Sequence, residues 1–144
     1  MNFKLFFENE SSLERESALN MIKDLKQIPS APSWEGYPTW DFGNQVYISL
    51  TNQDRDLESD ILNNDNKFPN IWYVENINSK NKGSGNATTA MLKLIEIARK
   101  NNIILRLYPK RTEKTKQSLN DKQLRSWYEK FGFRRVSNLY YELR

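Results

Sequence analysis

The chain contains no cysteine and no histidine. Without cysteine, disulfide frameworks and thiol nucleophiles are excluded; without either residue, Cys/His zinc sites and histidine-based triads are excluded too. If the protein is an enzyme, its acid and base must come from a carboxylate, a tyrosine, a lysine, the backbone or water.

Long apolar runs are also missing. No stretch approaches the roughly 20 apolar residues that a membrane-spanning helix needs, and the N-terminus lacks the apolar core of a signal peptide. A soluble, cytoplasmic protein is therefore expected. At 144 residues, 38% of them hydrophobic, the chain is long enough for one real core, so residues 1–144 are predicted to form a single domain.

Charge is distributed unevenly. Residues 1–98 carry 9 Lys/Arg and 14 Asp/Glu, whereas residues 99–144 carry 13 Lys/Arg and 4 Asp/Glu. The basic second part favours a polyanionic partner, which could be nucleic acid, a phosphorylated cofactor or an acidic protein. A solvated basic surface explains the same charge equally well. The Asn- and Lys-rich composition suggests the AT-rich genome of a bacterium or a phage.

Hydrophobic periodicity predicts a mixed α/β fold without internal repeats. Strands are expected at residues 2–7, 45–51, 70–77, 103–108, 133–136 and 139–143. Helices are expected at residues 13–27, 91–100 and 121–131. Ser11 and Glu14 fit a capping box at the start of the first helix. Residues 33–42 are predicted to form an aromatic loop, residues 43–44 a hairpin turn, residues 52–66 a loop with one short helix, and residues 110–118 a charged loop.

The segment KNKGSGNATTAML, residues 80–92, lies between a predicted strand and a predicted helix. Glycines in such a turn leave backbone N–H groups free to converge on one point, where the helix dipole adds partial positive charge, so the turn is suited to a phosphate. A P-loop does not fit because Asn86 follows the second glycine, and the Rossmann pattern lacks its third glycine.

A second motif, WYEKFGF at residues 127–133, closes a helix and turns into a strand. Together with Lys80-x-x-Gly83-x-Gly85, it resembles the GNAT family of N-acetyltransferases over residues 70–136. The resemblance implies a central, mostly antiparallel sheet of about six or seven strands with three or four helices. It also implies a splayed strand pair that admits the cofactor. Two positions depart from the family pattern: Lys80 replaces an Arg or Gln, and Ser84 replaces an apolar residue.

The resemblance further implies a set of site residues. The pyrophosphate of acetyl-CoA, the acetyl donor, would be bound by the glycine turn at Lys80, Lys82, Gly83, Ser84, Gly85 and Asn86. Backbone groups near Glu75 and Ile77 would bind the pantetheine arm in the wedge between the splayed strands. Tyr128 would protonate the departing thiolate, an amine would attack the acetyl group directly, and no metal would take part.

Other candidates follow from their positions. Glu75 is the first choice for a general base, ahead of Glu35 and Asp41, and deprotonation through water is an equal alternative. The resemblance implies that Asn120, which lies near an Asn position of the family, contacts CoA; alternatively Asn120, Asp121 or Ser118 is simply the N-cap of the last helix. The basic residues that could meet the 3′-phosphate of CoA or an acidic substrate are Lys110, Arg111, Lys114 and Lys116.

The leading functional prediction is an acetyl-CoA-dependent N-acetyltransferase whose acceptor is a protein lysine, a protein N-terminus or a small amine. One alternative is a GNAT-type toxin that acetylates aminoacyl-tRNA, with the basic second part binding tRNA. Another is a degenerate GNAT-fold binding or inhibitor protein without catalysis. No membrane partner is expected, and the sequence leaves a homodimer open.

Overall fold

A computed structural model describes residues 3–52, 69–81, 83–109 and 119–144, with side chains from residue 13 onward. Its helices are α1 (Phe3–Leu25), α3 (Asn86–Lys100) and α4 (Asp121–Lys130). Its strands are β1 (Ser30–Trp34), β2 (Tyr37–Asp41), β3 (Val46–Thr51), β4 (Ile71–Ser79), β5 (Ile104–Leu107), β6 (Arg134–Arg135) and β7 (Tyr141–Leu143).

The seven strands form one sheet in the order β1-β2-β3-β4-β5-β7-β6. Among the described strands, only β4 and β5 pair in parallel, because α3 connects them, and the other neighbours are antiparallel. The mixed α/β fold with a mostly antiparallel sheet is therefore confirmed. β4 lies in the middle of the sheet, as its apolar residues on both faces predicted.

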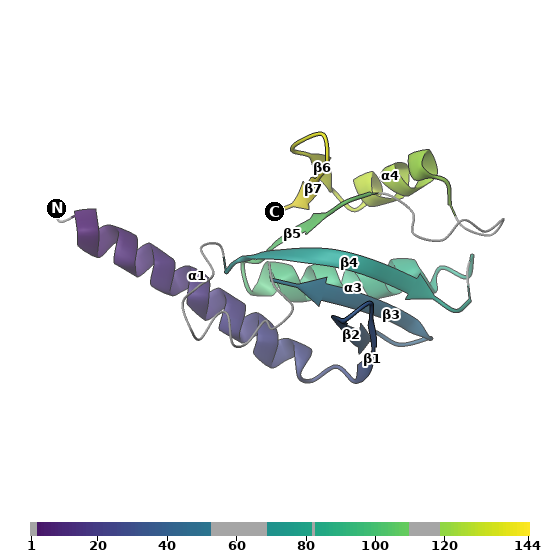
Figure 1. Cartoon of the computed structure of the whole chain (residues 1–144), viewed down its shortest axis with the longest axis horizontal. Helices are drawn as coiled ribbons and strands as arrows, with labels where there is room; N and C mark the ends of the chain where they lie inside the picture. The colour runs from purple at the N-terminus through teal and green to yellow at the C-terminus, as the bar shows by residue number, and fades with distance from the viewer. Residues whose placement is uncertain (1–2, 53–68, 82, 110–118) are drawn as a thin grey trace.

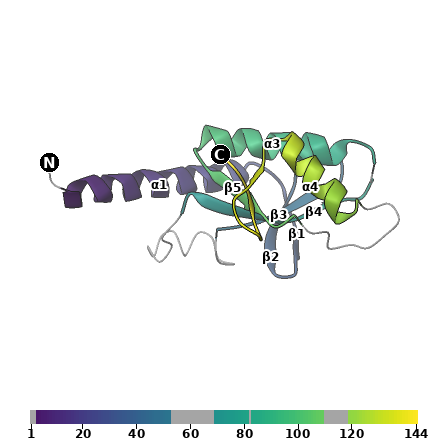
Figure 2. The same cartoon turned by 90° about the horizontal axis from the view of Figure 1, so that it is seen from above.

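Helix α3 runs along one face of the sheet (Figure 2). Its buried residues Met91 and Leu94 repeat at helical spacing and pack with Trp72 of β4 and Leu105 of β5, all fully buried. The second half of α1 adds Met21 to the same core, whereas its first half projects beyond the sheet (Figure 1).

The prediction of a strand at residues 2–7 is wrong, because residues 3–7 begin α1. Phe3, Phe6 and Phe7 stand at i, i+3 and i+4, which is helical spacing, and neither glycine nor proline interrupts the chain before residue 29. The predicted capping box is wrong for the same reason, since Ser11 and Glu14 lie inside the helix instead of at its start.

Residues 33–42 are not an aromatic loop. They belong to β1 and β2, a hairpin that turns at Glu35 and Gly36, both with positive φ (47° and 82°). Alternation of side chains between the two faces brings Trp34 and Tyr37 together as a stacked pair, with ring centroids 5.9 Å apart.

The predicted helix at residues 13–27 is part of α1, which begins ten residues earlier, at Phe3, and the remaining predicted strands and helices lie within five residues of their predicted bounds. The turn at residues 43–44 joins β2 to β3, and the predicted closing hairpin is formed by β6 and β7. The predictions for residues 52–66 lie outside the described residues except for Asn52, and those for residues 110–118 lie outside them entirely. No helix in the described part of the chain is long and apolar enough to cross a membrane.

Candidate functional site

The two central parallel strands separate partway along β4. β4 pairs with β5 only from Ile71 to Val74, yet it continues to Ser79 beside β3. Figure 1 shows the two strands diverging beyond this point, toward the start of α3. Among the described residues, no strand pairs with the second half of β4 on the side of β5.

A β-bulge marks the point of separation. Ser49 of β3 pairs with Asn76 and Leu50 pairs with Val74, so Glu75 is an extra residue in β4. A bulge of this kind bends its strand and increases the local twist, which accounts for the divergence from β5. Glu75 and Ile77, both half-buried, lie on the part of β4 that has left β5.

The carboxylate of Glu75 is held by one hydrogen bond. Thr51, which is only 2% exposed, donates from Oγ1 to Glu75 Oε1 at 2.8 Å. No other hydrogen bond or ion pair of this carboxylate is found within the described ranges, so Oε2 is available to accept a proton. Sequence reasoning missed Thr51, because the pairing of β3 with β4 cannot be read from a single sequence.

Both glycines of the predicted phosphate-binding turn adopt a backbone conformation that favours glycine. Gly83 and Gly85 both have left-handed φ, 80° and 82°, and a Cβ at either position would meet no atom within 4 Å. Gly85 is the N-cap of α3, and as a glycine it has no side chain with which to cap the helix. The first turn of α3 therefore carries backbone N–H groups that the N-cap residue does not satisfy through a side chain, together with the partial positive charge of the helix N-terminus.

Ser84 stabilises the turn from within. Its hydroxyl donates to the carbonyl oxygen of Asn81 at 2.6 Å and accepts from the amide of Asn86 at the long distance of 3.4 Å. The exposed Lys80 donates its own amide to Gln45 at 3.1 Å, so only its side chain could reach a phosphate. Lys82, also predicted to bind pyrophosphate, lies outside the described residues.

Helix α4 is attached to the first turn of α3. Trp127 donates from Nε1 to Thr88 Oγ1 at 3.2 Å, across 39 residues of sequence. This bond brings the WYEKFGF segment beside the glycine turn. The family resemblance depends on these two motifs. A surface hollow of about 560 Å³ lies along α4, lined by Leu119, Asn120, Lys122, Gln123, Ser126, Trp127 and Lys130.

Tyr128 follows Trp127 and belongs to the hydrophobic core. It is 8% exposed, and its ring packs edge-to-face on Trp127 and Phe133. Burial raises the pKa of the Tyr128 hydroxyl above its ordinary value, so the group keeps its proton at neutral pH. Within the described residues, this hydroxyl has no hydrogen-bond partner, although a buried tyrosine usually has one.

Asn120 is the N-cap of α4. Its Oδ1 accepts from the amide of Gln123 at 2.8 Å, and Gln123 Oε1 accepts from the amide of Asn120 at 3.0 Å, which completes a capping box. The structural alternative for Asn120 is thus confirmed, and contact with CoA would be left to its Nδ2. Lys110, Arg111, Lys114 and Lys116 lie outside the described residues.

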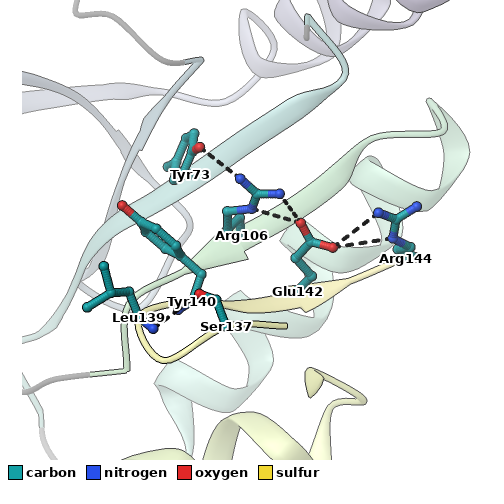
Figure 3. A network of polar contacts seen from close by, with 7 residues as sticks. All are labelled: Tyr73, Arg106, Ser137, Leu139, Tyr140, Glu142 and Arg144. Atoms are coloured by element: carbon teal, nitrogen blue, oxygen red, sulfur yellow. Dashed lines mark hydrogen bonds and ion pairs between the residues drawn. The ribbon is translucent and has the colours of Figure 1, made fainter. Parts of the chain in front are cut away.

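A buried ion-pair network next to the bulge was also missed (Figure 3). Arg106 of β5 donates to Glu142 of β7 through Nε at 2.8 Å and through Nη2, and to Tyr73 Oη through Nη1 at 3.1 Å. Arg144 binds the other oxygen of Glu142. The available signal was one charged residue inside each of two apolar segments, IILRLY and YYEL.

Comparison with known proteins assigns no family. No protein-family model matches the chain, and no curated protein matches it. One solved structure, the crystal structure of the anti-CRISPR protein AcrVA5, is similar at a TM-score of 0.45 and 12% identity. The match covers 81% of this chain and 100% of that one. A likeness this distant carries no argument about function.

Proposed function

We propose that the protein is an acetyl-CoA-dependent N-acetyltransferase. The observation that carries the proposal is the parting of β4 and β5 at Glu75, beside a glycine turn that begins α3. The parting leaves backbone groups of β4 without a neighbouring strand, and these suit the amides of a pantetheine arm. The glycine turn supplies N–H donors and partial positive charge for a pyrophosphate.

In the proposed reaction, the lone pair of a neutral acceptor amine attacks the thioester carbonyl carbon. The tetrahedral intermediate then collapses, the C–S bond breaks and CoA leaves as a thiolate. The amine proton passes to Glu75 Oε2 or to water, and the thiolate receives a proton from Tyr128. Glu75 is suited to its role because Thr51 fixes one of its oxygens while the other accepts the proton.

Tyr128 is suited to its role because burial keeps its hydroxyl protonated at neutral pH. The same burial makes it a weak acid, so part of its contribution would be hydrogen bonding to the developing thiolate. Such a mechanism needs neither cysteine nor histidine, and the chain contains neither.

Calorimetric titration with acetyl-CoA and with CoA tests the proposal. The wild-type protein should bind both, and Gly83→Glu should abolish binding, because a carboxylate would stand where the pyrophosphate is expected. Gly43→Glu is a matched control: Gly43 also has positive φ, 95°, and open space around a Cβ, but it lies in the turn between β2 and β3.

The outcomes separate clearly. Absence of heat with the wild-type protein would refute the enzyme and leave a non-catalytic binding protein. An equal loss of acetyl-CoA binding in Gly83→Glu and Gly43→Glu would indicate general destabilisation of the protein. Unchanged binding in Gly83→Glu would exclude the glycine turn as the pyrophosphate site.

A further inference from the structure

The hollow along α4 lies next to the glycine turn. Trp127, which lines the hollow, donates its hydrogen bond to Thr88 in the first turn of α3, three residues after Gly85. Figures 1 and 2 both show α4 beside the end of α3 that follows the glycine turn. A ligand that places its pyrophosphate at the glycine turn therefore has the hollow within reach of its next groups.

Two lysines border the hollow in one row along α4. Lys122, Ser126 and Lys130 follow each other at intervals of four residues, so they lie on one face of the helix. Both lysines are exposed, and no ion pair of either ammonium group is found within the described part of the chain. None of the residues that line the hollow is acidic. The row thus presents two positive charges, on Cα atoms about 12 Å apart along the helix axis, with a small side chain between them.

Trp127 adds an aromatic wall whose orientation is fixed. Besides the bond to Thr88, its ring packs edge-to-face with Tyr128 and Phe131, at centroid distances of 5.1 and 4.9 Å. The side chain is only half-buried and lines the hollow, so it can also contact a ligand. Nucleobases stack on such rings, and a ring that is already ordered loses little entropy when one binds.

We propose that the hollow binds the 3′-phosphorylated adenosine of CoA, with the adenine on Trp127 and the 3′-phosphate at Lys122 and Lys130. This inference rests on the proposed function and deepens it, because it assigns the specificity for the acetyl donor to α4. The protein then selects CoA over donors that present phosphopantetheine without a nucleotide. The aromatic ring and the two charges together fit a phosphorylated nucleoside better than a simple anion.

The test compares CoA with 3′-dephospho-CoA, which lacks only the 3′-phosphate, by calorimetric titration of the full chain. The wild-type protein should bind CoA about tenfold more tightly, the combined effect of two exposed ion pairs. This preference should shrink as salt screens the charges. In Lys122→Gln/Lys130→Gln it should fall below about twofold through weaker binding of CoA, while the affinity for dephospho-CoA should stay the same.

Arg99→Gln/Arg125→Gln is the matched control, because it removes the same charge from two exposed side chains outside the hollow. Arg125 is on α4 but does not line the hollow, and Arg99 lies in the last turn of α3, at the opposite end from the glycine turn. The control should keep the wild-type preference for CoA. All four substituted side chains are exposed, so the thermal unfolding of both double variants should match that of the wild type.

Equal affinity of the wild-type protein for CoA and dephospho-CoA would overturn this inference and leave the proposed function standing. A preference that persists in Lys122→Gln/Lys130→Gln would exclude the two lysines as the 3′-phosphate site. An equal loss of preference in both double variants would attribute it to net charge and overturn the inference as well.

Failure of the proposed function gives different results. If neither CoA nor dephospho-CoA binds, the inference and the proposed function fail together. If CoA binds with the expected preference but no amine is acetylated, the hollow stands as a nucleotide site and the proposed catalysis does not.

Discussion

Replacing Glu142 should destabilise the protein more than replacing any exposed charge. Glu142 is 5% exposed and accepts hydrogen bonds from Arg106, whose side chain is 24% exposed. Although its partial burial acts to lower the pKa of Arg106, the hydrogen bond to Glu142 raises it, so this guanidinium stays charged. In Glu142→Leu, a largely buried cation therefore loses its counter-ion.

The expected loss can be bounded from the geometry. Breaking a fully buried ion pair costs about 3–5 kcal/mol, and the partial exposure of Arg106 lets water replace some of the lost contacts, so we expect about 2–3 kcal/mol. Arg144, the other partner of Glu142, is 72% exposed, and Arg144→Met should cost less than about 0.5 kcal/mol.

Urea unfolding followed by tryptophan fluorescence measures these free energies. A double-mutant cycle with Arg106→Met isolates the interaction free energy between Arg106 and Glu142 from the other effects of each substitution. The double variant Arg106→Met/Glu142→Leu should be more stable than Glu142→Leu alone, because the unpaired cation is gone. If Glu142→Leu unfolds within about 0.5 kcal/mol of the wild type, or if removing Arg106 as well destabilises it further, the reasoning is refuted.

Two further predictions concern Tyr128 and Asp24. Tyr128→Phe should change the free energy of unfolding by less than about 0.5 kcal/mol, since the hydroxyl bonds no described residue, but should lower acetyl transfer to the acceptor by about 10²-fold. Unchanged turnover in a folded variant would exclude the acid role. The hydrogen bond from Asn101 and the ion pair with Lys100 lower the pKa of Asp24 in the folded protein. These contacts therefore stabilise the fold fully above the pKa of Asp24 in the unfolded chain, about 4, and the stabilisation is lost as the pH falls through the lower pKa of the folded protein. Asp24→Asn should therefore weaken the pH dependence of unfolding below about pH 4, and an unchanged profile would contradict this.

Much of the fold was predictable because its signals are local. The stripe of Met91, Leu94, Ile95 and Ala98 predicted a buried helix, and the helix starts only a few residues earlier than that stripe. The mistake at residues 2–7 has a physical cause. A short apolar run fits a strand as well as one face of a helix, and only the continuation of the chain decides between them.

The site was only partly predictable, because its decisive features are relations between strands. The glycine turn and the helix that follows were recognisable in KNKGSGNATTAML. The bulge at Glu75 depends on the register of β3 against β4, which no local pattern encodes. The bond from Thr51 to Glu75 and the pairing of Arg106 with Glu142 depend on the same register and on the order of strands in the sheet.

The two departures from the family pattern have different consequences in the structure. Ser84 is not a packing defect: its hydroxyl closes the turn by bonding Asn81 at 2.6 Å. Its bond from the Asn86 amide is long, 3.4 Å, so a phosphate oxygen could take over that donor at little cost. The backbone amide of Lys80 instead donates a hydrogen bond to the carbonyl oxygen of Gln45, so at this position only the flexible side-chain ammonium group can bind a phosphate. A weakened affinity for acetyl-CoA would therefore have its cause at Lys80, whereas the shape of the turn is kept by Ser84.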